Sequence, residues 1–137
     1  MSFEQGPIRP PSEAHSLLIR VTRNCPWNKC AFCRTYREAK FTLRNLEEVI
    51  ADIKYMAFIV EEIRELSLKK GEGGHITRKI VQDLFDHSHM YDDQYRSIAF
   101  WLYYGGESVF IQDADSLVLK TEDLTAILSF IRERFPF

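Results

Sequence analysis

The stretch that decides the fold is Ser16-Leu17-Leu18-Ile19-Arg20-Val21-Thr22, followed two residues later by Cys25-Pro26-Trp27-Asn28-Lys29-Cys30-Ala31-Phe32-Cys33. Its first part is a short apolar run with β-branched residues, which predicts a buried strand. Its second part holds all the cysteines of the chain. We therefore expect a strand that ends in a cysteine-rich functional loop, at the end where α/β-barrel proteins carry their chemistry.

The cysteine spacing, C-x4-C-x2-C, favours metal ligation over a disulfide framework, because an odd number of close cysteines pairs poorly. Three thiolates suit zinc or an iron–sulfur cluster. A structural zinc site needs a fourth ligand, and no histidine lies at the usual finger spacing from Cys33. The pattern favours a [4Fe–4S] cluster with one open iron. Zinc, or three unrelated buried cysteines, are the alternatives.

The charge pattern around the cysteines agrees with a bound anion. Seven cations and one anion, Glu38, lie between Arg20 and Arg44, whereas the whole chain has a net charge of −2. The local surplus predicts a negative group near the cysteines, such as a cluster whose 2+ core and three thiolates sum to −1. The overall charge argues against general nucleic-acid binding.

Length and composition indicate a single globular domain. The chain has 137 residues, 45% of them hydrophobic, which excludes a disordered protein. The longest apolar run, 98–104, is too short for a bilayer, which needs about 20 residues. The first residues do not resemble a signal peptide. We expect a soluble, cytoplasmic protein.

The remaining pattern alternates helices with one more strand. Residues 1–13 hold three prolines and predict an extended arm. Helical periodicity begins after Asn45, which pairs with Glu48 as a predicted N-cap. Further helices are expected from Thr77 and over about 93–104.

A second buried strand is expected over 108–112, followed by an acidic loop and a last helix with Thr121 as its N-cap and Pro136 as its stop. The residues expected to face inward on the second and last helices are Ile80, Val81, Leu84, Phe85, Leu124, Ile127, Leu128 and Ile131. This order of elements predicts an α/β fold.

The cysteine loop resembles that of the radical SAM (S-adenosyl-L-methionine) superfamily. The aromatic Phe32 before Cys33, with Tyr36 and Phe41 beyond it, and the stretches 9–14 and 21–25 resemble a branch with one extra residue between the first two cysteines. The resemblance implies the opening β/α units of a partial (β/α) barrel, incomplete as given, with an inserted helical segment. Residues 14–137 would be the truncated N-terminal part of that domain, with a third strand beginning at 135–137.

The resemblance also implies the cofactors. Cys25, Cys30 and Cys33 would hold a [4Fe–4S] cluster, and the amine and carboxylate of SAM would chelate its open iron. An electron from a donor such as flavodoxin or ferredoxin would cleave SAM to methionine and a 5′-deoxyadenosyl radical, which abstracts hydrogen from a substrate. Phe32 would flank the adenine. No side chain is assigned a catalytic role.

The acidic contact to SAM is expected after the second strand, at Asp113-Ala114-Asp115, where Asp115 would replace the family's glutamate. Asp113 is equally interpretable as a turn residue. The sequence Gly105-Gly106-Glu107 spells the family's motif but precedes the strand, so we interpret the two glycines as a helix stop.

Other interpretations of the whole chain stay open. The alternatives are a non-catalytic zinc or iron–sulfur module and an inactive fragment of a longer domain. The pair His87 and His89 is expected to lie on the surface or to bind metal only adventitiously.

Overall fold

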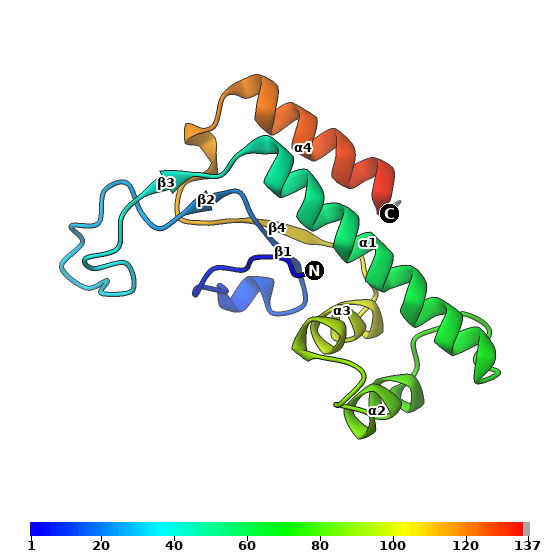
Figure 1. Cartoon of the computed structure of the whole chain (residues 1–137). Helices are drawn as coiled ribbons and strands as arrows, with labels where there is room; N and C mark the ends of the chain where they lie inside the picture. The colour runs from blue at the N-terminus through cyan, green and yellow to red at the C-terminus, as the bar shows by residue number, and fades with distance from the viewer. Residues whose placement is uncertain (136–137) are drawn as a thin grey trace.

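Two short parallel strands lie side by side in the computed structural model, which describes residues 1–135 (Figure 1). Strand β1 (Leu17–Arg20) pairs with β4 (Val109–Gln112), with Leu17 opposite Val109 and Arg20 opposite Gln112. Parallel neighbours need a long crossover connection, and three helices provide it here. The loops that follow Arg20 and Gln112 therefore leave the sheet at the same edge.

The predicted helices are confirmed. They are α1 (Leu46–Lys69), α2 (Arg78–Asp86), α3 (Asp93–Tyr103) and α4 (Thr121–Arg134). The side chain of Asn45 caps α1 by accepting a hydrogen bond from the backbone N–H of Glu47, at 2.8 Å. The predicted cap of α4 is wrong by one residue, because the carbonyl of Lys120 already accepts the first helical hydrogen bond, from Leu124.

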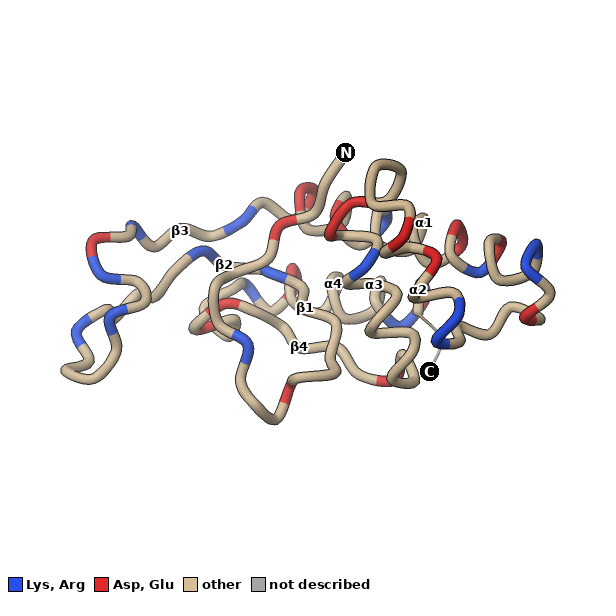
Figure 2. Tube along the Cα trace, turned by 90° about the horizontal axis from the view of Figure 1, so that it is seen from below, with Lys and Arg blue, Asp and Glu red and all other residues tan. Residues whose placement is uncertain are grey.

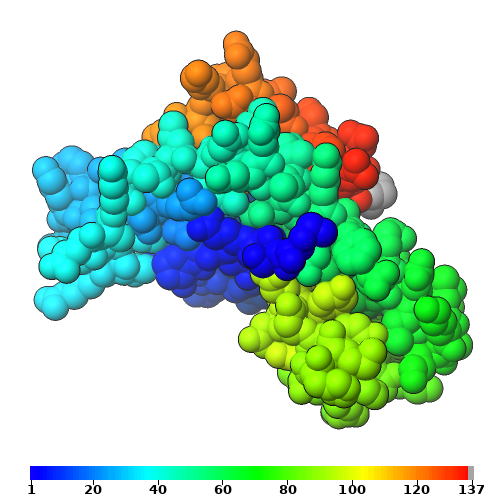
Figure 3. All heavy atoms as spheres, in the orientation of Figure 1, coloured from blue at the N-terminus to red at the C-terminus, as the bar shows by residue number. Residues whose placement is uncertain are grey.

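The core lies between the sheet and the helices. Helix α1 contacts β1, α3 and α4, and α2 packs on α3 (Figures 1 and 3). The fully buried side chains of α1 that build this core are Val49, Ile53, Met56, Ile59 and Ile63. Leu17 and Ile19 of β1 point to the same core, as alternate residues of a strand must.

Two of the predicted inward residues are exposed. Phe85 contacts the ring of Phe100 edge-on, with centroids 5.6 Å apart, at the outer seam between α2 and α3. Leu128 lines an open hollow beside β4 together with Val109 and Ile111. Both keep about 44% of their surface exposed because no described element covers them.

The N-terminal segment lies against the body of the protein. Residues 1–10 contain no helix or strand, and Pro11–Glu13 form a short 3-10 turn. Phe3 is buried in the core. The amide of Gly6 donates to the side chain of Gln112, at 2.7 Å, and that side chain donates in turn to the carbonyl of Ile8. The arm is therefore fixed to the end of β4.

Strands β2 (Thr22–Arg23) and β3 (Thr42–Leu43) form a second, antiparallel sheet. The sequence did not predict this hairpin, because strands of two residues carry no periodic pattern. Its stem closes the loop that contains the cysteines. The loop projects from the body of the protein (Figures 1 and 3).

The described part of the chain is mixed α/β, as predicted, and forms two small sheets and no closed barrel. Within residues 1–135, β4 pairs with a strand on one side only, so Val109, Phe110 and Ile111 are half-buried, not fully buried as predicted. The predicted helix stop at Pro136 lies outside the described residues, and of the predicted start of a third strand at 135–137 only Phe135 is described, as the buried C-cap of α4. No helix within residues 1–135 is long and apolar enough to span a membrane.

The packing of α1 predicts a test of the fold. Ile53→Ala should lower the free energy of unfolding by about 2–5 kcal/mol, because Ile53 is fully buried and its loss leaves a cavity. Leu68→Ala, at an exposed position of the same helix, should change it by less than about 0.5 kcal/mol. Urea denaturation followed by circular dichroism measures both. Equal effects of the two substitutions would contradict this core.

Candidate metal and cofactor site

The cysteines lie in the loop over residues 24–41, between β2 and β3. Cys25, Cys30 and Cys33 are each partly exposed, and no disulfide joins them. Within residues 1–135, no three His, Cys, Asp or Glu side chains are grouped closely enough to hold a metal. The donor types fit a soft metal or an iron–sulfur cluster. The loop would have to draw its three sulfurs together to complete the site.

Asparagines hold the loop across its width. Asn24 and Asn28 both adopt a left-handed backbone conformation, with φ of 70° and 48°, which asparagine tolerates better than most residues. The Asn24 side chain donates to the carbonyl of Lys40 at 2.6 Å, and that of Asn28 donates to the carbonyl of Tyr36. The amide of Asn28 also donates to the sulfur of Cys25 at 3.3 Å.

The positive charge near the cysteines is smaller than the sequence suggested. Arg20, Arg23 and Arg44 pair with acidic side chains from other parts of the chain. The exposed cations that remain on the loop are Lys29, Arg34, Arg37 and Lys40, against Glu38 alone. The sequence predicted a surplus of six positive charges in this region. The structure leaves a surplus of three, and these cations lie on the projecting loop (Figure 2).

A buried ionic cluster fixes the stem of the loop to α1. The guanidinium of Arg44 donates to Asp52 of α1 and to the carbonyl of Arg20, at 2.7 Å each. It also lies 2.9 Å from a carboxylate oxygen of Glu4, which Arg23 contacts at 3.0 Å. The N-terminal arm, the stem and the helix thus meet in one network.

This network changes the titration of Glu4. Burial by itself would raise the pKa of its carboxyl group, but the hydrogen bond from Arg23 and the charges of Arg44, Arg23 and Arg20 outweigh it and lower the pKa below the ordinary value of 4.5. The carboxylate is therefore the form that stabilises the folded chain.

Asp113 lies at the meeting point of the two parallel strands and the cysteine loop. One carboxylate oxygen accepts hydrogen bonds from the guanidinium of Arg20 and from the backbone N–H of Asn24, each at 2.9 Å. The other oxygen accepts from the hydroxyl of Tyr36. Only 1% of the Asp113 side chain is exposed. Both oxygens are already occupied by donors of the chain itself.

Tyr36 is kept protonated by this position. Burial, the hydrogen bond to Asp113 and the negative charge of Asp113 together raise the pKa of the Tyr36 hydroxyl well above its ordinary value of 10.0. The hydroxyl group therefore remains a hydrogen-bond donor at any pH at which the protein is handled.

The other residues expected to contact SAM lie on the two loops that follow the parallel strands. Asp115 accepts a hydrogen bond from the amide of Leu117 through Oδ1, at 3.2 Å, and so caps the short turn that follows β4. Ala114 is exposed on the same loop. Phe32 points into solvent with 91% of its surface exposed. The acidic loop and the cysteine loop are brought together through Asp113, whereas the Phe32 side chain, on the cysteine loop, extends into solvent.

Two other features singled out in the sequence, Gly105-Gly106 and the pair His87 and His89, lie outside the candidate site. Gly105 and Gly106 follow α3 with φ of 112° and 64°, and their amides bond to Leu102 and Trp101, which confirms the predicted helix stop. His87 and His89 are exposed at the end of α2, with ring centroids 6.1 Å apart. The ring of His87 bonds to the carbonyl of Asp83, at 2.8 Å.

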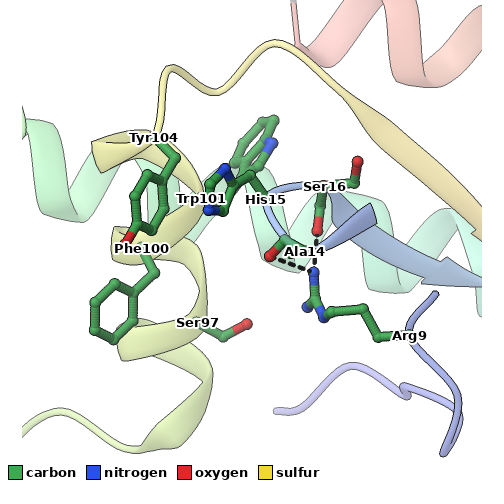
Figure 4. Close-up of a pocket in the computed structure, with 8 residues that line it drawn as sticks. All are labelled: Arg9, Ala14, His15, Ser16, Ser97, Phe100, Trp101 and Tyr104. Carbon is green, nitrogen blue, oxygen red and sulfur yellow. Dashed lines mark hydrogen bonds between the residues drawn. The ribbon is translucent and has the colours of Figure 1, made fainter. Parts of the chain in front are cut away.

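A separate hollow of about 270 Å³ lies at the opposite end of the sheet, next to the start of β1 (Figure 4). His15 stacks on Tyr104 there, with ring centroids 3.8 Å apart. Arg9 donates to the carbonyls of Ala14 and Ser16 through one nitrogen. This hollow is remote from the cysteines, because it adjoins the amino ends of the strands.

The sequence interpretation missed three members of the site. Arg20, Asn24 and Tyr36 all contact Asp113. Their separations from Asp113, 77 to 93 residues, leave no local pattern. The one available signal is a charged residue, Arg20, near the end of an otherwise apolar strand, since a buried charge needs a partner.

Comparison with protein-family models, with curated proteins and with solved structures gives no match for this chain.

The titration of Glu4 predicts how stability depends on pH. A carboxyl group with a lowered pKa stabilises the folded state above its unfolded pKa, near 4.5, and loses that contribution as the pH falls through the folded value. The free energy of unfolding should therefore fall below pH 4.5 more steeply in the parent chain than in Glu4→Gln. Urea titrations at a series of pH values measure the slopes. Glu65→Gln, on the exposed face of α1, is the matched control and should keep the parent slope.

Proposed function

We propose that this chain is the opening part of a radical SAM protein, which binds a [4Fe–4S] cluster through Cys25, Cys30 and Cys33 and uses SAM as its second cofactor. The observation that carries the proposal is the position of the three-cysteine loop. The cysteine loop follows the first of two parallel strands, and its Asn24 amide donates a hydrogen bond to Asp113, in the acidic loop that follows the second strand. In α/β barrels, that edge of the sheet carries the chemistry.

The fold supports a partial (β/α) barrel at a coarse level. A β-strand, a helical crossover, a parallel strand and a further helix follow one another, as in the first two units of such a barrel. The helices α2 and α3 would then be an insertion between the units. Further strands would add beside β4, whose outer edge has no strand partner within residues 1–135.

The donor set favours a cluster over zinc. Three thiols from one loop leave a zinc ion one ligand short, and no histidine lies at the usual finger spacing from Cys33. A [4Fe–4S] cluster with three thiolate ligands leaves one iron open for a small molecule. The hydrogen bond that the backbone N–H of Asn28 donates to the Cys25 sulfur suits a negatively charged cluster, and so do the cations of the loop.

SAM would bind between the two loops. Asp115 uses one oxygen to cap a turn, and its other oxygen would accept a charge-assisted hydrogen bond from the SAM amine. Ala114 would allow close approach, and Phe32 would close over the adenine. The Asp113 carboxylate, predicted from the sequence as a further SAM contact, is occupied by Arg20, Asn24 and Tyr36, whereas the SAM amine stays assigned to Asp115, as the sequence predicts.

When bound, these cofactors would supply reductive cleavage of SAM to a 5′-deoxyadenosyl radical, which abstracts hydrogen from a substrate. The chain's own residues would hold SAM in place and keep water away from it. The exposed cations of the loop, Lys29, Arg34, Arg37 and Lys40, offer a positive surface to an acidic electron donor such as flavodoxin or ferredoxin.

Anaerobic reconstitution tests the proposal. The purified chain should take up about four irons and about four sulfides, as a [4Fe–4S] cluster requires. Cys25→Ala, Cys30→Ala and Cys33→Ala should each lose most of this iron and sulfide, because two thiolates leave the cluster poorly held. Thr35→Ala, at an exposed position of the same loop, is the control and should retain both.

Reduced, reconstituted protein should then release 5′-deoxyadenosine from SAM, as measured by chromatography. Uptake of one zinc ion without sulfide would favour the non-catalytic metal module instead. If a cluster forms but SAM is not cleaved, the cluster-binding part of the proposal stands and the proposed use of SAM is contradicted.

A further inference from the structure

The Asp113 carboxylate receives donors from three separate segments of the chain. Arg20 ends β1, Asn24 begins the cysteine loop, and Tyr36 lies beyond the last cysteine. Asp113 itself directly follows β4. One buried group therefore ties both sides of the cysteine loop to the edge of the parallel sheet.

We infer that Asp113 is a positioning residue, which holds the cysteine loop in the conformation that receives its metal or cluster, with Tyr36 as its tether on the far side of the loop. The inference rests on the proposed function only in taking the three cysteines as metal ligands. It assigns Asp113 a role through the loop, not through a contact to SAM.

Electrostatics explains why a carboxylate is needed here. Arg20 is almost buried, with 11% of its side chain exposed, and its short contact to Asp113 at 2.9 Å neutralises it. Its other acidic neighbour, Glu4, lies farther away at 3.4 Å and is shared with Arg23 and Arg44. Removing the charge of Asp113 would leave Arg20 poorly compensated, which is costly in a buried site.

Geometry explains why the loop would respond. The carboxylate offers acceptors on two sides, to the Asn24 amide on one and to the Tyr36 hydroxyl on the other. An asparagine at 113 has one acceptor oxygen and would present an N–H₂ group to one of these donors. The two sides of the loop could then no longer be held by the same side chain.

The cysteines lie between these two tethers, in a segment held by hydrogen bonds of its own. The side chain of Asn28 donates across the loop to the carbonyl of Tyr36, and Arg37 donates to the carbonyls of Cys30 and Cys33. Tyr36 takes part in the first of these through its own carbonyl. Releasing the Tyr36 hydroxyl should therefore loosen the segment that carries the second and third cysteines.

The first measurement uses the chain without metal. Amide hydrogen exchange followed by mass spectrometry should show that Tyr36→Phe raises exchange in the loop by roughly three- to tenfold, the effect of one lost hydrogen bond. Asp113→Asn should raise it further. Exchange in α4 should remain at the parent value in both variants. Tyr103→Phe, an exposed tyrosine on α3, is the matched control and should change nothing in the loop.

The second measurement uses the reconstituted chain. Loss of iron to a chelator, followed by absorbance, should be faster by a similar factor in Tyr36→Phe than in Tyr103→Phe. A purely structural role would lower the unfolding temperature without changing the rate of iron loss from folded protein. Tyr36→Phe keeps the buried charge pair intact, so it tests the inference even if Asp113→Asn fails to fold.

The outcomes separate the two claims. Unchanged loop exchange in Tyr36→Phe would overturn the positioning role, whatever the cluster does. Unchanged iron loss from a cluster that forms normally would overturn it as well and leave the proposed function standing. Failure of the parent chain to take up iron and sulfide would contradict the proposed function, whereas the exchange data would still decide whether Asp113 and Tyr36 order the loop.

Discussion

The parallel pairing of β1 with β4 fixes where the cysteine loop and the acidic loop of this chain lie. Two parallel neighbours release their next segments at the same edge, so the cysteine loop and the acidic loop meet although Cys25 and Asp113 are far apart in sequence. Helix α1 packs against β1, and the crossover helices α1, α2 and α3 together supply most of the core. An antiparallel arrangement of the same strands would have placed the two loops at opposite ends.

Buried charges join this edge to the rest of the fold. Asp113 neutralises Arg20 and holds the loop, while Asp52 neutralises Arg44 and holds the stem to α1. Glu4 brings the N-terminal arm into the same network. Such pairs contribute little net stability compared with apolar packing, because desolvation offsets their attraction. Their effect is to specify one arrangement of arm, stem and loop, which the proposed metal site would require.

Elements that follow from a local sequence pattern were predictable, and contacts between residues far apart in sequence were not. The strand around Ile19, the apolar face of α1 and the stop at Gly105-Gly106 follow from local patterns. The short hairpin around the cysteines carries no pattern, so it was missed. The local charge surplus was overestimated because the partners of its arginines, among them Glu4 and Asp113, are distant in sequence. Leu128 was misassigned because periodicity shows which face is apolar but not whether another element covers it.

The central claim is that Cys25, Cys30 and Cys33 leave one iron of a cluster open and that SAM occupies it. Electron paramagnetic resonance of the reconstituted, reduced chain tests this most directly, because the spectrum reports the ligands of the cluster. The account predicts the signal of a reduced [4Fe–4S] cluster whose line shape changes when SAM is added. A cluster signal that is indifferent to SAM, or the absence of any cluster signal, would contradict it.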